Sequence, residues 1–141
     1  MAKTAAWQTP TELAYMAGFF DGEGYVGISS DKPAWKNGGV YYRMRVNVTQ
    51  KDPTVLLSFR KIYGGTLHKG KDGVWKWYID GKKGCVFLSD MMPYLIIKKE
   101  QAKLALEFSA LNTGKGKSTE AKKRQEAISK EIKKLKVKQY A

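Results

Sequence analysis

The apolar and polar residues near the start of the chain follow a helical pattern. A helix is predicted over about 10–22, because Thr9 can cap it, Pro10 suits its first position and Glu12 completes a capping box. The two glycines that flank Glu23 favour a C-terminal cap. This interpretation places Glu23 just past the end of the helix.

The clearest strand pattern in the chain runs over 40–50. Every second residue is apolar, and the residues between are polar, basic or aromatic. The strand should therefore lie on a core with one face and leave the other face open. The apolar set is Tyr42, Met44, Val46 and Val48, and the open set is Tyr41, Arg43, Arg45, Asn47 and Thr49.

The remaining pattern supplies enough elements for one α+β domain over residues 1–141. The order is helix, two strands, helix, two strands, helix, with a further C-terminal helix. It predicts a four-stranded, saddle-like antiparallel sheet with helices packed on one face. The further elements are a strand over 25–28, a turn over 31–39, a helix from 52 to about 63, a hairpin of strands 66–69 and 74–80, a short helix over 84–92 interrupted at Pro93, a helix over 98–111, a flexible break at 114–117 and a basic amphipathic helix over about 118–136.

Charge narrows the class of partner. The chain has 26 Lys and Arg against 13 Asp and Glu, a formal net charge of +13, which favours a polyanion and above all nucleic acid. A generic basic structural protein remains an alternative. Cys85 and His68 are the only residues of their types, which excludes an intramolecular disulfide and a Cys/His zinc cluster. Without a signal-peptide or membrane-span pattern, we expect a soluble, intracellular protein with no membrane partner.

The open sheet face carries the residue types that read bases. Arg43, Arg45, Asn47, Lys76 and Tyr78 should project from it. Arginine can contact guanine and asparagine can contact adenine through paired hydrogen bonds in the major groove. The alternative is a sheet face that is polar only because water covers it.

The first helix has a row of small residues at intervals of four, formed by Ala14, Gly18 and Gly22. Such a row allows close helix packing, so it is a candidate homodimer interface. Two paired copies would bring their Glu23 carboxylates together beside the helix ends, where a divalent cation such as Mg²⁺ can bind oxygen ligands. The alternatives are tight packing within one domain and a solvated Glu23.

Four segments then carry a family resemblance. "LAYMAGFFDGEGYVGI" resembles the LAGLIDADG motif of homing endonucleases, and "NVTQKDP", "YLIIKKEQAKLALEF" and "EAISKEIKKL" resemble later segments of that family in the same order. Chains with a single motif form homodimers in this family. The resemblance therefore implies an endonuclease that cuts a long, near-palindromic site in double-stranded DNA with Mg²⁺ or Mn²⁺. A non-cutting DNA binder or an RNA maturase of the same fold is the alternative.

The resemblance also implies roles for single residues. Glu23 matches the metal-binding acid, which is more often Asp in the family, and Gly22 matches the position whose carbonyl helps to bind metal. Gln50 matches a polar residue beside the active-site water, Lys98 a basic residue near the scissile phosphate, and Asp21 a structural position. With strand alternation, the expected DNA-facing residues are Tyr25, Gly27, Ser29, Tyr41, Arg43, Arg45, Asn47, Thr49, His68, Lys76 and Tyr78.

Overall fold

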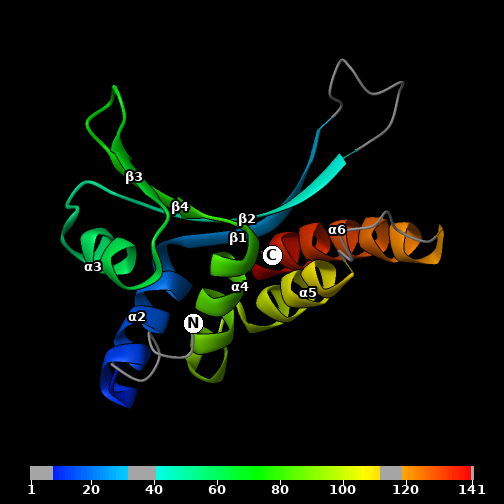
Figure 1. Ribbon diagram of the computed structural model, residues 1–141, viewed down its shortest axis with the longest axis horizontal. Helices are drawn as coiled ribbons and strands as arrows, with labels where there is room; N and C mark the ends of the chain where they lie inside the picture. The colour runs from blue at the N-terminus through cyan, green and yellow to red at the C-terminus, as the bar shows by residue number, and fades with distance from the viewer. Residues whose placement is uncertain (1–7, 32–40, 112–118, 141) are drawn as a thin grey trace.

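The computed structural model describes residues 8–31, 41–111 and 119–140, so the turn predicted after Asp31 and the break predicted at 114–117 lie outside the described residues. The helices and strands follow the predicted order (Figure 1). They are α2 (Pro10–Glu23), β1 (Gly24–Asp31), β2 (Tyr41–Gln50), α3 (Thr54–Tyr63), β3 (Thr66–Lys69), β4 (Trp75–Ile79), α4 (Gly81–Met91), the 3₁₀ turn η1 (Met92–Tyr94), α5 (Lys99–Ala110) and α6 (Thr119–Tyr140).

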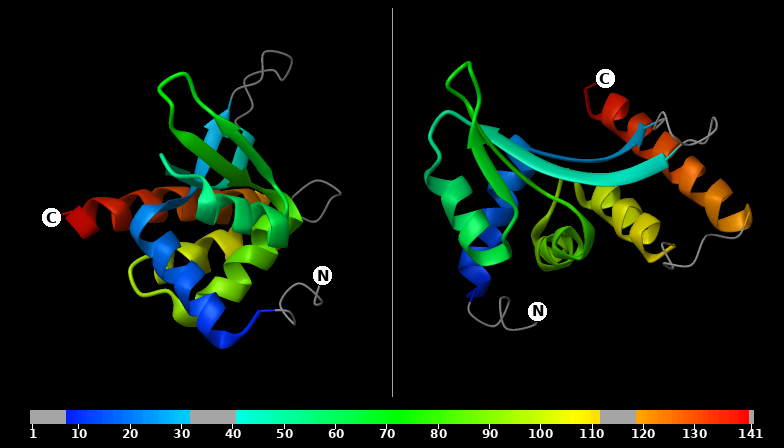
Figure 2. Two further views of the ribbon diagram at one scale, coloured as in Figure 1. Left: turned by 90° about the vertical axis from the view of Figure 1, so that its left-hand side faces the viewer. Right: turned by 45° about the horizontal axis from the view of Figure 1, so that its top comes forward.

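The strands form a single antiparallel sheet with the order β1-β2-β4-β3. The sheet is strongly curved, and the helices pack on one side of it, which confirms the α+β prediction (Figures 1 and 2). The first strand, β1, lies at an edge of the sheet. After β4 the chain adds α4, η1, α5 and α6, which correspond to the predicted segments over 84–92, with its interruption at Pro93, 98–111 and about 118–136.

The start of α2 matches its sequence pattern. Thr9 Oγ1 accepts a hydrogen bond from the Glu12 amide at 3.1 Å, and the Thr9 amide donates to Glu12 Oε1 at 2.9 Å. This reciprocal pair is the predicted capping box.

The predicted end of α2 is wrong by one residue and in its cause. The helix includes Glu23, and Gly24 is extended, with φ −91° and ψ 173°, rather than left-handed. A Cβ at position 24 would lie 2.3 Å from Cδ1 of Phe20. Gly24 is therefore needed because the Phe20 ring packs against the backbone where the helix becomes β1. Glu23 is the last helical residue.

Two other boundaries also differ from prediction. Helix α4 begins at Gly81, before the predicted start at 84, and α6 continues to Tyr140, past the predicted end at 136. By contrast, α3 ends at Tyr63 as predicted, and Gly64 follows it with a positive φ of 84°.

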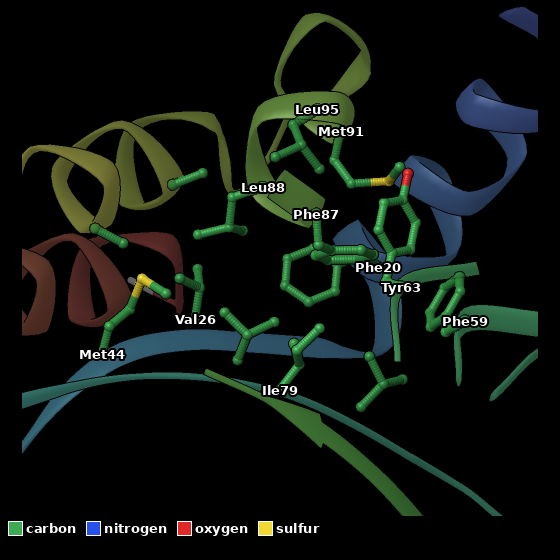
Figure 3. Packing of buried hydrophobic residues seen from close by; sticks show 14 of the residues in the cluster. Phe20, Val26, Met44, Phe59, Tyr63, Ile79, Phe87, Leu88, Met91 and Leu95 are labelled. Carbon is green, nitrogen blue, oxygen red and sulfur yellow. The ribbon is translucent and has the colours of Figure 1, made fainter. Parts of the chain in front are cut away.

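Aromatic rings dominate the core between the sheet and the helices. Phe20, Phe59 and Phe87 come from α2, α3 and α4 and converge there (Figure 3). The Phe20 and Phe87 rings meet nearly edge to face, with centroids 5.1 Å apart. Trp77 is fully buried, Nε1 donating to the Gly64 carbonyl at 2.8 Å, and Trp75 packs partly buried against the core. Both tryptophans therefore belong to the core.

The alternation of β2 decides which face of the sheet is covered. Met44, Val46 and Val48 are buried under the helices, whereas Arg43 and Arg45 are only partly buried. The opposite, open face is therefore available to a partner. Among the described residues, every helix is too short or too polar to span a lipid bilayer.

Candidate nucleic-acid interface and active site

Sheet register gathers the predicted DNA-facing residues into rows across the open face. Tyr25 lies opposite Asn47, which lies opposite Tyr78 on the next strand. A second row joins Thr49, Lys76 and His68. Toward the far end of the long hairpin, Arg45 is opposite Gly27 and Arg43 is opposite Ser29. The backbone of Tyr41 continues β2, but its side chain lies outside the described residues.

The arginine side chains of this face contact polar residues on neighbouring strands. Arg45 Nε donates to Ser29 Oγ at 3.0 Å. Arg43 Nη2 lies 3.3 Å from Asp80 Oδ2, and both side chains are about half exposed. An exposed pair of this kind is weak, so Arg43 can exchange Asp80 for another acceptor.

The second hairpin adds a concave patch to the same face. The His68 and Tyr78 ring centroids are 5.8 Å apart, and Lys76 Nζ lies 5.7 Å from the Tyr78 ring. A hollow of about 250 Å³ opens here. It is lined by Arg45, Val46, Asn47, His68, Lys76, Tyr78, Ile79 and Asp80.

Helix α2 has the two different sides that its sequence predicts. Met16 and Phe20 are buried in the core and Leu13 is partly buried. On the other side Ala14, Gly18 and Gly22 are exposed, and a Cβ added at either glycine would meet no atom of the described residues within 4 Å. Within the described part of the chain, the row of small residues is therefore not used for packing. Its pairing with a second copy stays a prediction.

Asp21 fixes the chain that leads into α5. Its carboxylate is 8% exposed, and Oδ2 accepts hydrogen bonds from the amides of Ile96 at 2.7 Å and Ile97 at 3.1 Å. Oδ1 accepts from the Lys98 amide at 2.9 Å. This geometry gives Asp21 the structural role that was predicted, as a clamp between α2 and the start of α5.

Lys98 is brought to the C-terminal end of α2. Its Nζ donates to the Asp21 carbonyl oxygen at 2.5 Å. Burial lowers the pKa of the Lys98 ammonium, while the negative charges of Asp21 and Glu23 oppose that shift. Two of the predicted active-site residues, Glu23 and Lys98, are thus close enough to interact electrostatically.

Gln50 reaches the same region through the sheet. It is the last residue of β2, two positions beyond the pair formed by Gly24 and Val48 at the start of β1. The register places it beside the junction of α2 with the sheet. Its side chain is partly buried. A contact between Gln50 and a reacting group stays a prediction.

The donor atoms at this junction fit a hard divalent cation in part. Glu23 is exposed at the helix end, where free backbone carbonyls, including that of the preceding Gly22, add negative character. These are the oxygen ligands that Mg²⁺ and Mn²⁺ prefer. Within the described part of one chain, no group of three His, Cys, Asp or Glu side chains could hold a metal. One copy therefore offers only part of such a site.

Sequence reasoning missed two residues near the site. Asp80 was not singled out, although it pairs with Arg43 across the sheet. Lys136 was not singled out either, although its Nζ lies 3.5 Å from the centroid of the Tyr25 ring. A signal for Lys136 was present, because it continues the stripe of Ile128 and Ile132 at intervals of four.

Comparison with known proteins gives a consistent result. The family model described as LAGLIDADG endonuclease matches residues 16–101. The DNA endonuclease I-CvuI of Chlorella vulgaris is 32% identical over 102 residues, which cover 68% of this chain. The match spans 62% of the length of that relative.

Solved structures show the same fold. That of the homing endonuclease I-CvuI with the I-CreI target and Mg, its DNA uncleaved, has a TM-score of 0.80 at 25% identity. The comparison covers 89% of this chain and 82% of that one. The archaeal intron-encoded homing endonuclease I-Vdi141I, complexed with DNA, has a TM-score of 0.77 at 22% identity, over 89% of this chain and 84% of its own.

Proposed function

Because the chain belongs to the LAGLIDADG endonuclease family, we propose that it is a site-specific DNA endonuclease. It acts as a homodimer on a long, near-palindromic duplex and hydrolyses one phosphodiester on each strand with a divalent metal. The observation that carries the proposal is the hydrogen bond from Lys98 Nζ to the Asp21 carbonyl, which places Lys98 at the end of α2, where Glu23 is the last helical residue. An acid that can bind metal and a cation that can bind phosphate thus lie beside the open face.

The dimer is formed through α2. The exposed row of Ala14, Gly18 and Gly22 allows two helix backbones to approach closely, because no described residue lies within 4 Å of a Cβ added at either glycine. Pairing along this row brings together the two helix ends and their Glu23 carboxylates. The repulsion between these negative groups favours cation binding. A two-fold dimer also reads two equivalent half-sites, which explains a near-palindromic target.

Each residue of the site then has a distinct task. The Glu23 carboxylate and the Gly22 carbonyl of each copy would hold Mg²⁺ or Mn²⁺. Bound there, the cation would supply positive charge to activate water and to stabilise the leaving oxygen. Gln50 orients water at the end of β2. Lys98, fixed by Asp21, places positive charge beside the phosphate that gains negative charge in the transition state.

Base recognition belongs to the open sheet face. Arg43, Arg45 and Asn47 alternate along β2 on that face, and Lys76 and Tyr78 extend it onto β4. The curvature of the sheet suits a surface that follows a groove (Figure 2). Arginine and asparagine side chains there can contact guanine and adenine edges in the major groove.

A cleavage selection tests the proposal. The purified protein is incubated with a pool of randomised inverted-repeat duplexes in Mg²⁺ and, separately, in Ca²⁺. Glu23→Gln is compared with Glu126→Gln, which changes an exposed glutamate on α6 that forms an ion pair with Lys130 of the same helix. We expect one near-palindromic sequence to be cut by wild type and Glu126→Gln in Mg²⁺, and to be bound but uncut by Glu23→Gln.

Two outcomes would contradict the proposal. Cleavage by Glu23→Gln at the wild-type rate would remove Glu23 from the metal site. Retention of one sequence without cleavage by wild type would make the protein a DNA binder. A comparison with folded intron RNA would then test the maturase alternative.

A further inference from the structure

The last turns of α6 reach the edge of the sheet beside the candidate active site. The helix is fixed along its length by burial of Ile128 and Ile132 and by a hydrogen bond of 3.1 Å from Gln125 Nε2 to the Phe108 carbonyl of α5. It also packs against β1, which is the edge strand. A residue near this end can therefore reach around the edge onto the open face.

Lys136 occupies that position. Its Nζ lies 3.5 Å from the centroid of the Tyr25 ring, a close cation–π contact on the same face as Asn47 and Tyr78. The space for the ammonium group depends on Gly27, because a Cβ there would lie 2.7 Å from Lys136 Nζ. Tyr25 is thus a platform that orients Lys136, in addition to any contact of its own.

The electrostatic surroundings of Lys136 differ from those of Lys98. Burial first, and then the positive charges of Lys98 and Lys133, lower the pKa of Lys136 to about 8. Lys98 has Asp21 and Glu23 as negative neighbours. Among the described residues, no carboxylate forms an ion pair with Lys136. Lys98 and Lys136 are therefore neighbouring cations. Among the described residues, Lys98 has negative neighbours, whereas Lys136 forms an ion pair with no carboxylate.

We propose that Lys136 is a phosphate-binding residue, which contacts a backbone phosphodiester of the DNA beside the one that Lys98 faces. This inference rests on the proposed function, because it assumes that duplex DNA lies on the open face. A phosphate placed between the two ammonium groups removes their mutual repulsion and supplies the missing counter-charge. The contact fixes the register of the DNA on the site and carries no sequence information.

The salt dependence of DNA binding tests this assignment directly. Affinity of a labelled duplex is measured by fluorescence anisotropy in Ca²⁺ over a series of KCl concentrations. Loss of one phosphate contact reduces the slope of log K against log salt by about 0.9 per protomer. We expect that reduction for Lys136→Met and not for Lys136→Arg, which keeps the charge and the ring contact. Lys130→Met is the matched control, since Lys130 is exposed on the same helix and pairs with Glu126.

A slope for Lys136→Met equal to that of wild type would overturn the proposal. Wild-type protein provides a second measurement that does not depend on the stability of a variant. The pKa of Lys136, followed by NMR of its labelled Cε, should rise from about 8 when duplex DNA is added. Its neighbours in this titration are Tyr25 on β1, Lys98 before α5 and Lys133 on α6. An unchanged pKa would equally refute a phosphate contact.

Cleavage in Mg²⁺ is measured in parallel, so that the two hypotheses fail separately. A reduced salt slope for Lys136→Met, together with no cleavage by wild type, would refute the endonuclease and leave the phosphate contact in place. Normal cleavage by wild type, together with an unchanged salt slope for Lys136→Met, would support the endonuclease and refute the phosphate contact. Single phosphates along the selected target are then replaced by neutral methylphosphonates. The phosphate that Lys136 contacts is the one whose replacement makes the DNA affinity of Lys136→Met equal to that of wild type.

Discussion

Removal of the Asp21 carboxylate should affect both the stability of the fold and the position of Lys98. Oδ2 accepts from the amides of Ile96 and Ile97, and Oδ1 accepts from that of Lys98. In Asp21→Asn, the best orientation keeps the oxygen on the side with two donors. The new NH₂ group then faces the Lys98 amide, so that a donor meets a donor.

The magnitude follows from this geometry. Asp21→Asn loses one hydrogen bond to a charged acceptor and weakens two others, and we expect a loss of about 2–3 kcal/mol in the free energy of unfolding. Asp21→Ala removes every acceptor and should cost about 3–5 kcal/mol, which is large for a single substitution. Water can reach the strongly exposed Ile96, which limits the cost of the unpaired amides.

Urea unfolding, followed by circular dichroism, measures these losses. Asp52→Asn is the control, because the exposed Asp52 carboxylate accepts from the Thr54 amide at 2.9 Å and the Thr54 hydroxyl at 2.6 Å. Water replaces that acceptor easily, so the control should cost much less than Asp21→Asn. If Asp21→Asn is no more destabilising than Asp52→Asn, the clamp is not a major stabilising feature. A second consequence is kinetic. Asp21→Asn should slow cleavage more than it weakens DNA binding, because the Lys98 amide loses its hydrogen bond to the Asp21 carboxylate.

Other predictions concern the two surfaces that a partner would contact. Gly18→Leu adds a side chain where nothing lies within 4 Å, so the protomer should fold normally. The bulk should block pairing of α2, and an unchanged dimer mass in sedimentation would contradict this interface. Arg43→Ala and Arg45→Ala should each relax specificity at one symmetric pair of bases, at a cost of about 1–3 kcal/mol in a binding selection. Uniform loss on all sequences would instead identify phosphate contacts. Asp80→Asn releases Arg43 from its ion pair and should strengthen DNA binding at low salt more than at high salt, whereas weaker binding would assign Asp80 itself to the DNA contact.

Local patterns were sufficient for most of the fold. The alternation of β2 predicts its buried and open faces because each apolar residue in it lies on the same core. The end of α2 was predicted less well, since a glycine after a helix usually adopts a left-handed conformation. Gly24 instead provides room for Phe20, and this requirement depends on packing rather than on local propensity.

The long-range contacts around the site could not be predicted from local sequence patterns. The hydrogen bonds of Asp21 join residues about 75 positions apart, and nothing near Asp21 in the sequence specifies its partners. The placement of Lys136 on Tyr25 depends on how far α6 extends past the edge of β1. The family resemblance therefore implied roles for Glu23 and Lys98, but not the groups that position them.

Lys98 and Lys136 compensate different negative charges at the proposed site. Lys98 lies near Glu23 in the absence of DNA, so it offsets part of the repulsion between two helix ends brought together in a dimer. Lys136 has only positive neighbours among the groups that shift its pKa, and its charge is therefore left for the substrate. One lysine thus favours assembly of the site before DNA binds, and the other increases the affinity for a phosphate after assembly. We therefore expect that a carboxylate introduced beside Lys136 would weaken DNA binding even though it would stabilise the free protein.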